Sequence, residues 1–500
     1  MKKFFNKIGK YLILVFLLLL GLAAVGVLYL FFVPGSNLFG ITYISKNTLV
    51  ESDKFAIDAI NCVKLTSTNY NVHVVTTESD KVSVKVLNNS FGFVKKEVKD
   101  VKISAETIED TLVFVVTEPT GFALKNNSYI QLILPANHEV DLSLKNSAAE
   151  TSISSENLKL NDLSYTTKNG NATLSNVTIT GSVDLSLGNS TFTTGEIVMP
   201  NKSTSKINIS LTTGKFDATN SILGDVTVKA NERGIIEIKE CNIFYEEVAV
   251  AGGSIKIGKL LEAIIKTSDT NVKLGEVTDN VIITLTNSGN VEIDSIAYSS
   301  DIITKQGDVK INSAKCPQLV LQTDSGNITA TGLNNYVNAL TTHGQINLTW
   351  ADDAEHHNTE TSSNSRHLRA SITGNGKVVA KGVEHVDITI EGRGRAELNM
   401  PTVSGKNKIS GHNGSVSVLV ASNAQYALKT TSESGSVKVN LMQVPNFQGY
   451  TDLDHEIIYV NSDNDEYPTA TNLEEWATNV NLLEITTKSG SLTVLNPSLN

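Results

Sequence analysis

The 500-residue sequence predicts an all-β protein, a parallel β-helix with a period of about 19 residues, preceded by one N-terminal transmembrane helix. Three observations lead to this prediction. An uncharged apolar run occupies residues 11–33, a glycine-centred turn recurs along the rest of the chain, and polar and apolar residues alternate after each turn. Alternation with a period of two is typical of strands, and a fixed period of this length is typical of solenoids.

The N-terminal segment carries the signals of a membrane anchor. Its first ten residues contain four lysines and no acid, and the apolar run Tyr11–Val33 follows. As a helix the run would be roughly 34 Å long, enough to cross about 30 Å of hydrocarbon. Because positive residues stay on the cytoplasmic side, we expect residues 1–10 to be a cytoplasmic tail and residues 34–500 to be extracytoplasmic. A cleaved signal peptide is the alternative, although the run is longer than a usual signal sequence.

The next region, residues 34–145, is rich in strands but not periodic. Alternation and β-branched residues predict strands at Val72–Val75, Val82–Val86, Thr111–Val116, Tyr129–Leu134 and Val140–Leu144. Pro135 begins a turn between the last two of these strands.

From about residue 146 the glycine-centred turn sets the period. The turn residues are Gly170, Gly188, Gly214, Gly234, Gly253, Thr270, Gly289, Gly307, Gly326 and Gly344, followed after an interruption by Gly376, Gly394, Gly414, Gly435 and Gly490. A strand follows each turn, whereas a phosphate-binding loop needs a helix there. We therefore expect the glycines to supply a positive φ at tight corners.

Alternation after each turn assigns one set of side chains to the interior. The predicted inward pairs are Ile236/Ile238, Ile255/Ile257, Val272/Leu274, Val291/Ile293, Val309/Ile311, Ile328/Ala330 and Ile346/Leu348. On the outward face, stacking of coils about 4.8 Å apart should bring Lys273 beside Glu292 and Glu292 beside Lys310.

Two insertions interrupt the repeat. The predicted order after the N-terminal region is β-helix at 146–350, a polar loop insertion at 351–372, β-helix again at 373–441, an aromatic and acidic insertion at 442–485, and a terminal coil at 486–500. The second insertion contains a capping-box pattern at Thr471 that predicts a short helix.

Composition excludes several classes of protein. The formal net charge is −11, which argues against a nucleic-acid partner, since phosphate binding needs a basic face. Three cysteines are too few for a disulfide scaffold. Cys241 and Cys316 should lie about four coils apart, which is too far for a disulfide bond between them. We expect three isolated, buried thiols.

Neither insertion presents a convincing catalytic or metal site. The first holds Asp352, Asp353, Glu355, His356 and His357, but adjacent histidines in a loop lack the spacing of zinc ligands. The second holds Asp463, Asp465 and Glu466, without the glycine and distal glutamate of a calcium loop. No paired carboxylates are visible along the outward strand faces, so we predict no catalytic residue, no metal and no cofactor.

Aromatic residues single out the second insertion as a candidate docking site. Binding hot spots favour tryptophan and tyrosine over the serine and threonine of the solenoid faces. The candidate partner-binding residues are Phe447, Tyr450, Tyr459, Tyr467 and Trp476. The alternative is that the insertion covers the end of the β-helix with its aromatic side chains buried.

One stretch resembles a known family. The run Ile130–Pro135, the strand at Val140–Leu144 and the turn at Asn169–Gly170 are similar to the bacterial DUF4097 family, whose members are described as adhesins. The resemblance implies a parallel β-helix outside the cytoplasm and carries no catalytic residues.

Three functions therefore remain open. The first is a non-enzymatic, membrane-anchored surface adhesin or envelope scaffold that binds a surface glycan or a protein. The second is a carbohydrate-active β-helix enzyme, because fold alone does not exclude a lyase or hydrolase. The third is a scaffold that assembles end to end, for which uncapped coil ends would be the mark.

Overall fold

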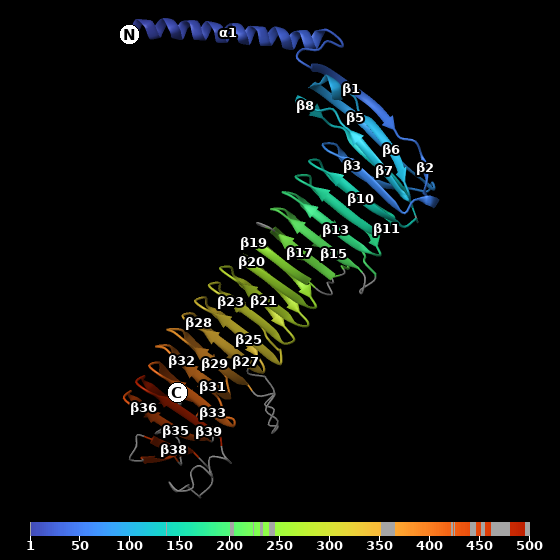
Figure 1. Cartoon of the computed structure of the whole chain (residues 1–500). Helices are drawn as coiled ribbons and strands as arrows, with labels where there is room; N and C mark the ends of the chain where they lie inside the picture. Colours follow the sequence, from blue (N-terminus) through green and yellow to red (C-terminus); the bar gives the residue numbers. More distant parts are fainter. Residues whose placement is uncertain are drawn as a thin grey trace. The chain divides into compact units, whose positions relative to one another are not determined.

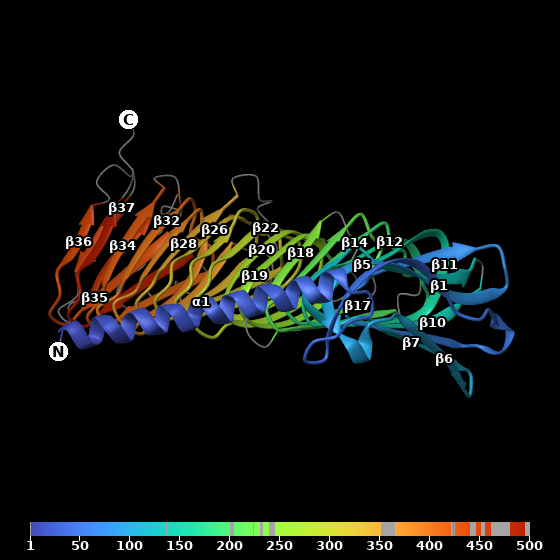
Figure 2. The same ribbon diagram turned by 90° about the horizontal axis from the view of Figure 1, so that it is seen from above.

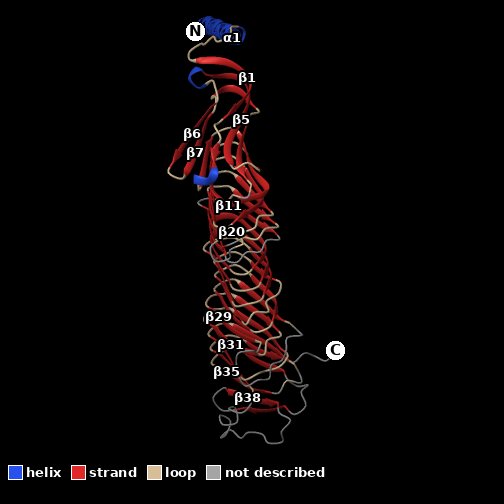
Figure 3. Cartoon of the chain, turned by 90° about the vertical axis from the view of Figure 1, so that its right-hand side faces the viewer, coloured by secondary structure: helices blue, strands red, loops and turns tan. Residues whose placement is uncertain are grey.

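A computed structural model describes residues 2–495, apart from 137, 201–204, 224, 231–233, 240–245, 352–365, 422–423, 425, 441–446, 452–455 and 462–480. The described elements are almost all strands, with one long helix and two short 3-10 helices, Ile57–Ala59 and Lys96–Val98 (Figure 3). The chain divides into two compact units, residues 1–208 and residues 209–500.

The first unit begins with helix α1 (Lys2–Phe32), drawn in blue in Figure 1. The most apolar 18 residues within its segment Gly9–Phe32 have a mean hydropathy of 2.9, and the segment is long and apolar enough to cross a membrane. The helix therefore begins within the predicted tail and ends one residue before the predicted Val33. By length and composition it is a single anchor or a signal sequence.

An antiparallel sheet follows the helix. Strand β1 (Ile41–Glu51) pairs with β5 (Lys81–Lys95), which also pairs with β8 (Gly121–Asn126), β9 (Tyr129–Pro135) and the short β2 (Phe55–Ala56). Strand β6 (Lys102–Ile108) pairs with β7 (Thr111–Thr117), also antiparallel. These strands contain or match the strands predicted at 82–86, 111–116 and 129–134.

Parallel pairing begins earlier in the chain than the predicted start of the solenoid at residue 146. In one row β7, β3 (Cys62–Ser67), β10 (Val140–Asn146), β11 (Thr151–Thr167) and β13 (Ser182–Leu187) pair in that order. In a second row the order is β9, β4 (Asn71–Thr77), β11, β12 (Ala172–Ile179) and β14 (Thr191–Gly195). Hence the antiparallel strands close the first coils of the solenoid. The sequence before residue 146 has no regular spacing of turns, so it does not predict these coils.

The second unit is built from long parallel rows of strands, as in a solenoid (Figures 1 and 2). Its early strands, after β15 (Lys206–Leu211) at the unit boundary, are β16 (Lys215–Thr219), β17 (Asp225–Ala230), β18 (Gly234–Lys239), β19 (Glu246–Leu260) and β20 (Ala263–Val277). Strand β20 then pairs with two strands, which begin the two rows.

We call these rows the first ladder and the second ladder. The first ladder contains β21 (Val281–Leu285), β23 (Ser300–Thr304), β25 (Gln318–Thr323), β27 (Tyr336–Thr341), β29 (His367–Ile372), β31 (His385–Ile390) and β33 (Lys406–Gly411). The second contains β22 (Val291–Ile296), β24 (Val309–Ile311), β26 (Ile328–Leu333), β28 (Gln345–Trp350), β30 (Lys377–Lys381), β32 (Arg395–Met400) and β34 (Ser415–Val420).

The predicted inward residues form the core of the second unit. Val272 pairs with Val291, and Val291 pairs with Val309, so like residues stack on like residues one coil apart. All seven predicted inward pairs are buried. The predicted outward row is confirmed as well, because Lys273 and Lys310 lie 2.9 and 3.5 Å from carboxylate oxygens of Glu292.

Polar side chains bridge neighbouring coils outside this core. Asn312 Nδ2 donates to Asp294 at 3.1 Å, and Asn287 Nδ2 donates to Asp269 at 2.8 Å, each across one coil. The abundance of asparagine and aspartate at outward positions therefore serves the stacking of coils.

Residues 367–372, predicted to belong to the polar insertion, form strand β29 instead. Leu368, Ala370 and Ile372 alternate with polar residues and are buried, so this segment continues the first ladder directly from β27.

The turn glycines have a different role from the predicted one. Within the predicted set, only Gly253 and Gly289 have a positive φ, of 124° and 143°. At most of the others, a Cβ atom would overlap a backbone carbonyl of the preceding coil; at Gly307 it would meet the carbonyl oxygen of Gly289. Stacked corners come so close together that there is no space for a side chain.

The end of the chain does not lie at the end of the stack. Strands β39 (Leu482–Thr487) and β40 (Leu492–Leu495) lie between the coil of β33 and β34 and the coil of β35 (Tyr426–Ser432) and β36 (Val437–Asn440). The C-terminal coil is thus interleaved, and its Leu483, Ile485, Leu492 and Val494 are buried.

Antiparallel strands then extend the first ladder beyond β35. Strand β38 (Glu456–Asn461) pairs with β35, and β37 (Phe447–Thr451) pairs with β38, both antiparallel. The predicted short helix at Thr471 lies outside the described residues.

The described cysteines are free thiols. Cys316 is buried, and burial raises the pKa of its thiol to about 11. Cys62 is only partly buried, contrary to the prediction, because it stands at the very start of β3, beside the charged Lys64. Cys241 lies outside the described residues.

Candidate functional site

The structure brings three of the five predicted partner-binding residues onto one hairpin. Phe447 and Tyr450 lie on β37 and Tyr459 lies on β38, where the backbone of Tyr459 pairs with both Gly449 and Leu428. Tyr467 and Trp476 lie outside the described residues. The hairpin therefore joins the insertion to the last strand of the first ladder, and its role in binding stays a prediction.

The two clusters of acidic residues that were considered as catalytic or metal sites, the first of which also holds two histidines, lie outside the described residues as well. These are Asp352, Asp353, Glu355, His356 and His357 in the first insertion and Asp463, Asp465 and Glu466 in the second. Among the residues that the structure does describe, no group of three or more histidine, cysteine, aspartate or glutamate side chains could hold a metal ion.

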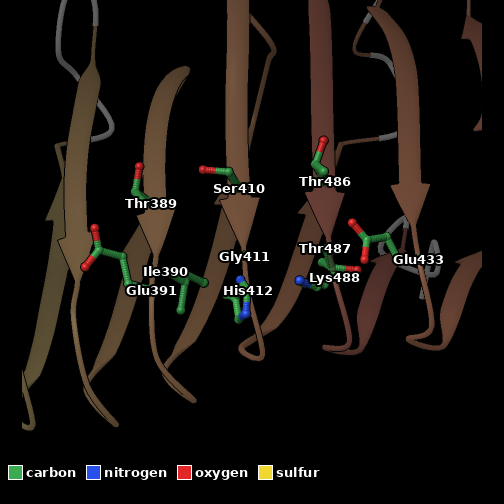
Figure 4. Close-up of a pocket in the computed structure, with 10 residues that line it drawn as sticks. All are labelled: Thr389, Ile390, Glu391, Ser410, Gly411, His412, Glu433, Thr486, Thr487 and Lys488. Atoms are coloured by element: carbon green, nitrogen blue, oxygen red, sulfur yellow. The ribbon is translucent and has the colours of Figure 1, made fainter.

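A surface groove of about 470 Å³ lies at the corners of the last coils (Figure 4). Strands β31, β33 and β39 contribute to it near their carboxyl ends, together with Glu433 after β35. The lining residues are Thr389, Ile390, Glu391, Ser410, Gly411, His412, Glu433, Thr486, Thr487 and Lys488.

Backbone pairing arranges the lining side chains in two rows. Thr389, Ser410 and Thr486 are register partners on the three strands and form a row of hydroxyl groups. One residue past each strand, the amide of His412 donates to the carbonyl of Ile390 at 2.9 Å, and the amide of Lys488 donates to Gly411 at 3.0 Å.

The second row consequently carries charge. It contains Glu391, His412, Lys488 and Glu433 in spatial order, all exposed. Gly411 lies between the two rows and leaves room there, since an added Cβ would have no neighbour closer than 3.8 Å. The groove thus offers hydroxyl, carboxylate, imidazole and ammonium groups to an extended polar ligand.

The geometry of the groove does not match that of a glycosidase. Glu391 and Glu433 are three coil steps apart, about 14 Å at the usual strand spacing, whereas paired catalytic carboxyls are about 5–9.5 Å apart. His412 and Lys488 lie between them. The groove can bind a polar chain by hydrogen bonds, but its carboxyls are too far apart to divide acid and base roles.

This groove is absent from the sequence-based predictions. The members of its charged row are 21 to 97 residues apart in the chain, and Lys488 enters this row only because the C-terminal coil is interleaved. Each residue of the charged row directly follows the last residue of a strand, and this position is the one local signal that they share.

A stack of aromatic rings runs across three neighbouring coils at the start of β29. The ring of His367 lies 4.8 Å from that of Tyr336 and 4.3 Å from that of His385. Within the described chain, Nε2 of His367 is buried without a hydrogen-bond partner. Burial, and next the neighbouring His385, lowers the pKa of His367 to about 4, with Asp387 acting in the opposite direction.

This pKa predicts acid-dependent stability. The unfolded chain takes up a proton at the ordinary pKa of 6.5, before the folded chain does. The stability that comes from this pKa difference of His367 is therefore fully present above pH 6.5 and is lost as the pH falls towards 4. His367→Phe should remove on the order of 1–3 kcal/mol of the difference between pH 7.5 and pH 4.5. Denaturant unfolding at both pH values measures it, and an unchanged difference would contradict the assignment.

Comparisons with known proteins place part of the second unit in a family. Solenoid ladders with in-register corners define a β-repeat protein, and residues 235–381 match the family model described as Toastrack DUF4097. This part of the chain is a DUF4097 toastrack domain, which confirms the resemblance, although the residues that first indicated it lie before the matched segment. No curated protein matches the chain.

Solved structures with distant likeness cover most of the chain. One is a "putative cell adhesion protein" from Clostridium sporogenes, with 9% identity, 90% of this chain and 100% of that chain covered, and a TM-score of 0.15. Two are described as a "putative adhesin", each with 71% of this chain and 98% of that chain covered. The one from Bacteroides fragilis has 12% identity and a TM-score of 0.15, and the one from Parabacteroides distasonis has 16% and 0.14.

Proposed function

We propose that this protein is a non-enzymatic, membrane-anchored β-helix module of the cell surface, which binds an extended polar ligand for adhesion or as an envelope scaffold. Helix α1 is the uncleaved anchor, with the lysine-rich start in the cytoplasm and residues 34–500 outside. The ligand is a surface glycan or a protein segment with both charged and hydroxyl groups.

The in-register row of Glu391, His412, Lys488 and Glu433 carries this proposal. Its residues come from four successive coils, so a ligand that follows the stack meets one polar group at each coil. The neighbouring hairpin of β37 and β38 pairs with the last of these coils and contains Phe447, Tyr450 and Tyr459, residue types that are common in binding hot spots.

Both rival functions have weaker support. The wide separation of the groove carboxyls disfavours a hydrolase, as argued above. Antiparallel strands extend the first ladder at β35 and close the first coils near β7 and β9, and such ends disfavour end-to-end stacking.

Deletion of residues 443–478, bridged by a short Gly/Ser segment, should abolish ligand binding with only a small fall in the melting temperature. The deletion removes the pairing of β38 with β35, but each coil of a solenoid contacts only its neighbours, so the preceding coils should stay folded. Loops that project from a rigid scaffold usually carry binding residues, so this insertion should act in binding. Cells that display the full-length chain would be applied to glycan and protein arrays, and the same variants would be melted after purification. A large fall in the melting temperature, or unchanged binding, would show that the insertion only covers the end of the stack.

The groove is tested in the same assay. Lys488→Ala should weaken binding, whereas Lys310→Ala, an exposed lysine on an outward row far along the chain, is the matched control. Protease added to intact spheroplasts should degrade the C-terminal part of every variant, and full protection would overturn the proposed orientation.

A further inference from the structure

The sheet of β1, β5 and β8 has an aromatic outer face. Tyr43 pairs with Phe93, and Phe93 pairs with Phe122, so the three rings form one row across the sheet. Their centroids are 5.6 and 5.4 Å apart. Phe31, in the last turn of α1, packs against Tyr43 at 4.6 Å and continues this row onto the helix.

This aromatic face is open, while the other face of the sheet is buried. Phe91 and Phe122 are 44% and 54% exposed, whereas Thr42, Ile44 and Val94 point to the interior. Lys125 Nζ lies 5.7 Å from the ring centroid of Phe91, at the edge of the row. Contiguous exposed apolar side chains on a soluble domain mark a surface that contacts a partner or a membrane.

The segment between the helix and the sheet folds back along the helix. Ser36 Oγ donates to the carbonyl of Tyr29 at 3.3 Å, and Thr42 Oγ1 donates to the carbonyl of Ser36 at 2.8 Å. Leu38 packs beside Gly26, where an added Cβ would come within 2.8 Å of Leu38 Cδ2. Gly26 precedes the helix end by six residues, or about 9 Å along the axis. Leu38 therefore lies alongside the apolar part of the helix.

Phe39, at the tip of this segment, combines an exposed apolar side chain with a strained backbone, and both are unfavourable in water. Its side chain is 93% exposed, and its φ of 51° falls in the left-handed region that bulky residues avoid. Strained backbone that presents an apolar side chain to solvent points to a function in contact with another phase or molecule.

We propose that Phe39, Phe91 and the aromatic row of Tyr43, Phe93 and Phe122, together the juxtamembrane face, insert into the outer interface of the bilayer that α1 spans. The proposal rests on the anchoring function of α1 proposed above. The packing of Phe31 against Tyr43 indicates that the bilayer is the partner of this face. It makes the aromatic row continuous with the last turn of a helix that leaves the bilayer at that point. Aromatic rings are favoured at this depth, and Lys125 can extend its ammonium group to the lipid phosphates.

Tryptophan depth measurements test the inference on the full-length chain in nanodiscs. Phe39→Trp and Phe122→Trp would each be compared in discs of phosphatidylcholine and in discs of phosphatidylcholine brominated on the acyl chains. The emission of the unaltered chain is subtracted. We expect bromine quenching that corresponds to a depth of about 5–10 Å below the headgroup boundary. Leu20→Trp in the helix is the positive control, and Leu261→Trp, an exposed leucine of the second unit, is the negative control.

The controls separate failure of this inference from failure of the anchor. If Leu20→Trp is quenched but Phe39→Trp and Phe122→Trp are not, the face lies off the membrane and the inference is wrong, while the anchor stands. If iodide in the buffer also fails to quench these two positions, a protein surface covers the face, which again overturns the inference. If Leu20→Trp itself is not quenched, or carbonate strips the chain from native membranes, the anchor has failed, and the inference fails with it.

Discussion

Ile293→Asp should destabilise the coil that carries it by about 3–5 kcal/mol, because it leaves a buried charge without a partner. Ile293 is fully buried and stacks between Leu274 and Ile311, its register partners on the neighbouring coils. None of these apolar neighbours can pair with a carboxylate. In a solenoid each coil contacts only its neighbours, so the damage should be greatest in β20, β22 and β24.

The adjacent residue provides the matched control. Glu292 lies on the outward face, where hydrogen bonding to Lys273 holds the pKa of its carboxyl below the usual value. Glu292→Ala should leave the stability of the coil nearly unchanged, because exposed ion pairs contribute little. Ile293→Val, which keeps the apolar character, should cost about 0.5–1.5 kcal/mol.

Native-state hydrogen exchange, resolved by peptide, measures these effects coil by coil. Early exchange of peptides that contain β20, β22 and β24 in Ile293→Asp, but not in Glu292→Ala, is the expected result. Equal protection in the two variants would mean that the inward and outward faces have been assigned wrongly.

The core could be predicted from the sequence because two periods act together. Alternation decides which face of a strand is inward, and the repeat of the turn decides which residues stack. The stacking of Val272, Val291 and Val309 therefore follows from their spacing in the chain, and their register pairing confirms it. The charge row of Lys273, Glu292 and Lys310 follows from the same two periods.

The role of the corner glycines could not be predicted in this way. A glycine in a turn is usually explained by backbone conformation, which is a local property. At Gly307 and its equivalents the cause is the carbonyl group of the corner below, about 19 residues away in the chain. Threonine three residues earlier is a usable signal for such corners, since Thr304 Oγ1 donates to the carbonyl of Gly307 at 3.2 Å.

The order of the last coils could not be predicted from the sequence either, and therefore neither could the groove. Each coil has the same alternation and the same corner, so nothing local states which coil it stacks on. The aromatic residues of the second insertion stand out by composition, whereas Lys488 and Glu433 become neighbours only through the interleaved C-terminal coil.

Gly490→Ala should disrupt both contacts of that interleaved coil. An added Cβ would overlap the carbonyl oxygen of Gly414, and the carbonyl of Gly490 already fills the space beside Gly435. The overlapping atoms are backbone, so relief requires that the coils separate. Overpacking of this kind costs about 1–3 kcal/mol, and occasionally more.

Gly411→Ala is the control for this variant, because its Cβ would make only ordinary contacts at 3.8 Å or more. Backbone hydrogen bonds tie the interleaved coil on both sides, from Val416 to the carbonyl of Ser491 and from Leu492 to that of Ser436, each at 2.8–2.9 Å. In Gly490→Ala, hydrogen exchange should accelerate in β34, β40 and β36 together, while Gly411→Ala keeps the protection of the unaltered chain. If only β40 and its own flanks respond, the C-terminal coil lies at the outer end of the stack, and the groove residue Lys488 is no neighbour of Glu433.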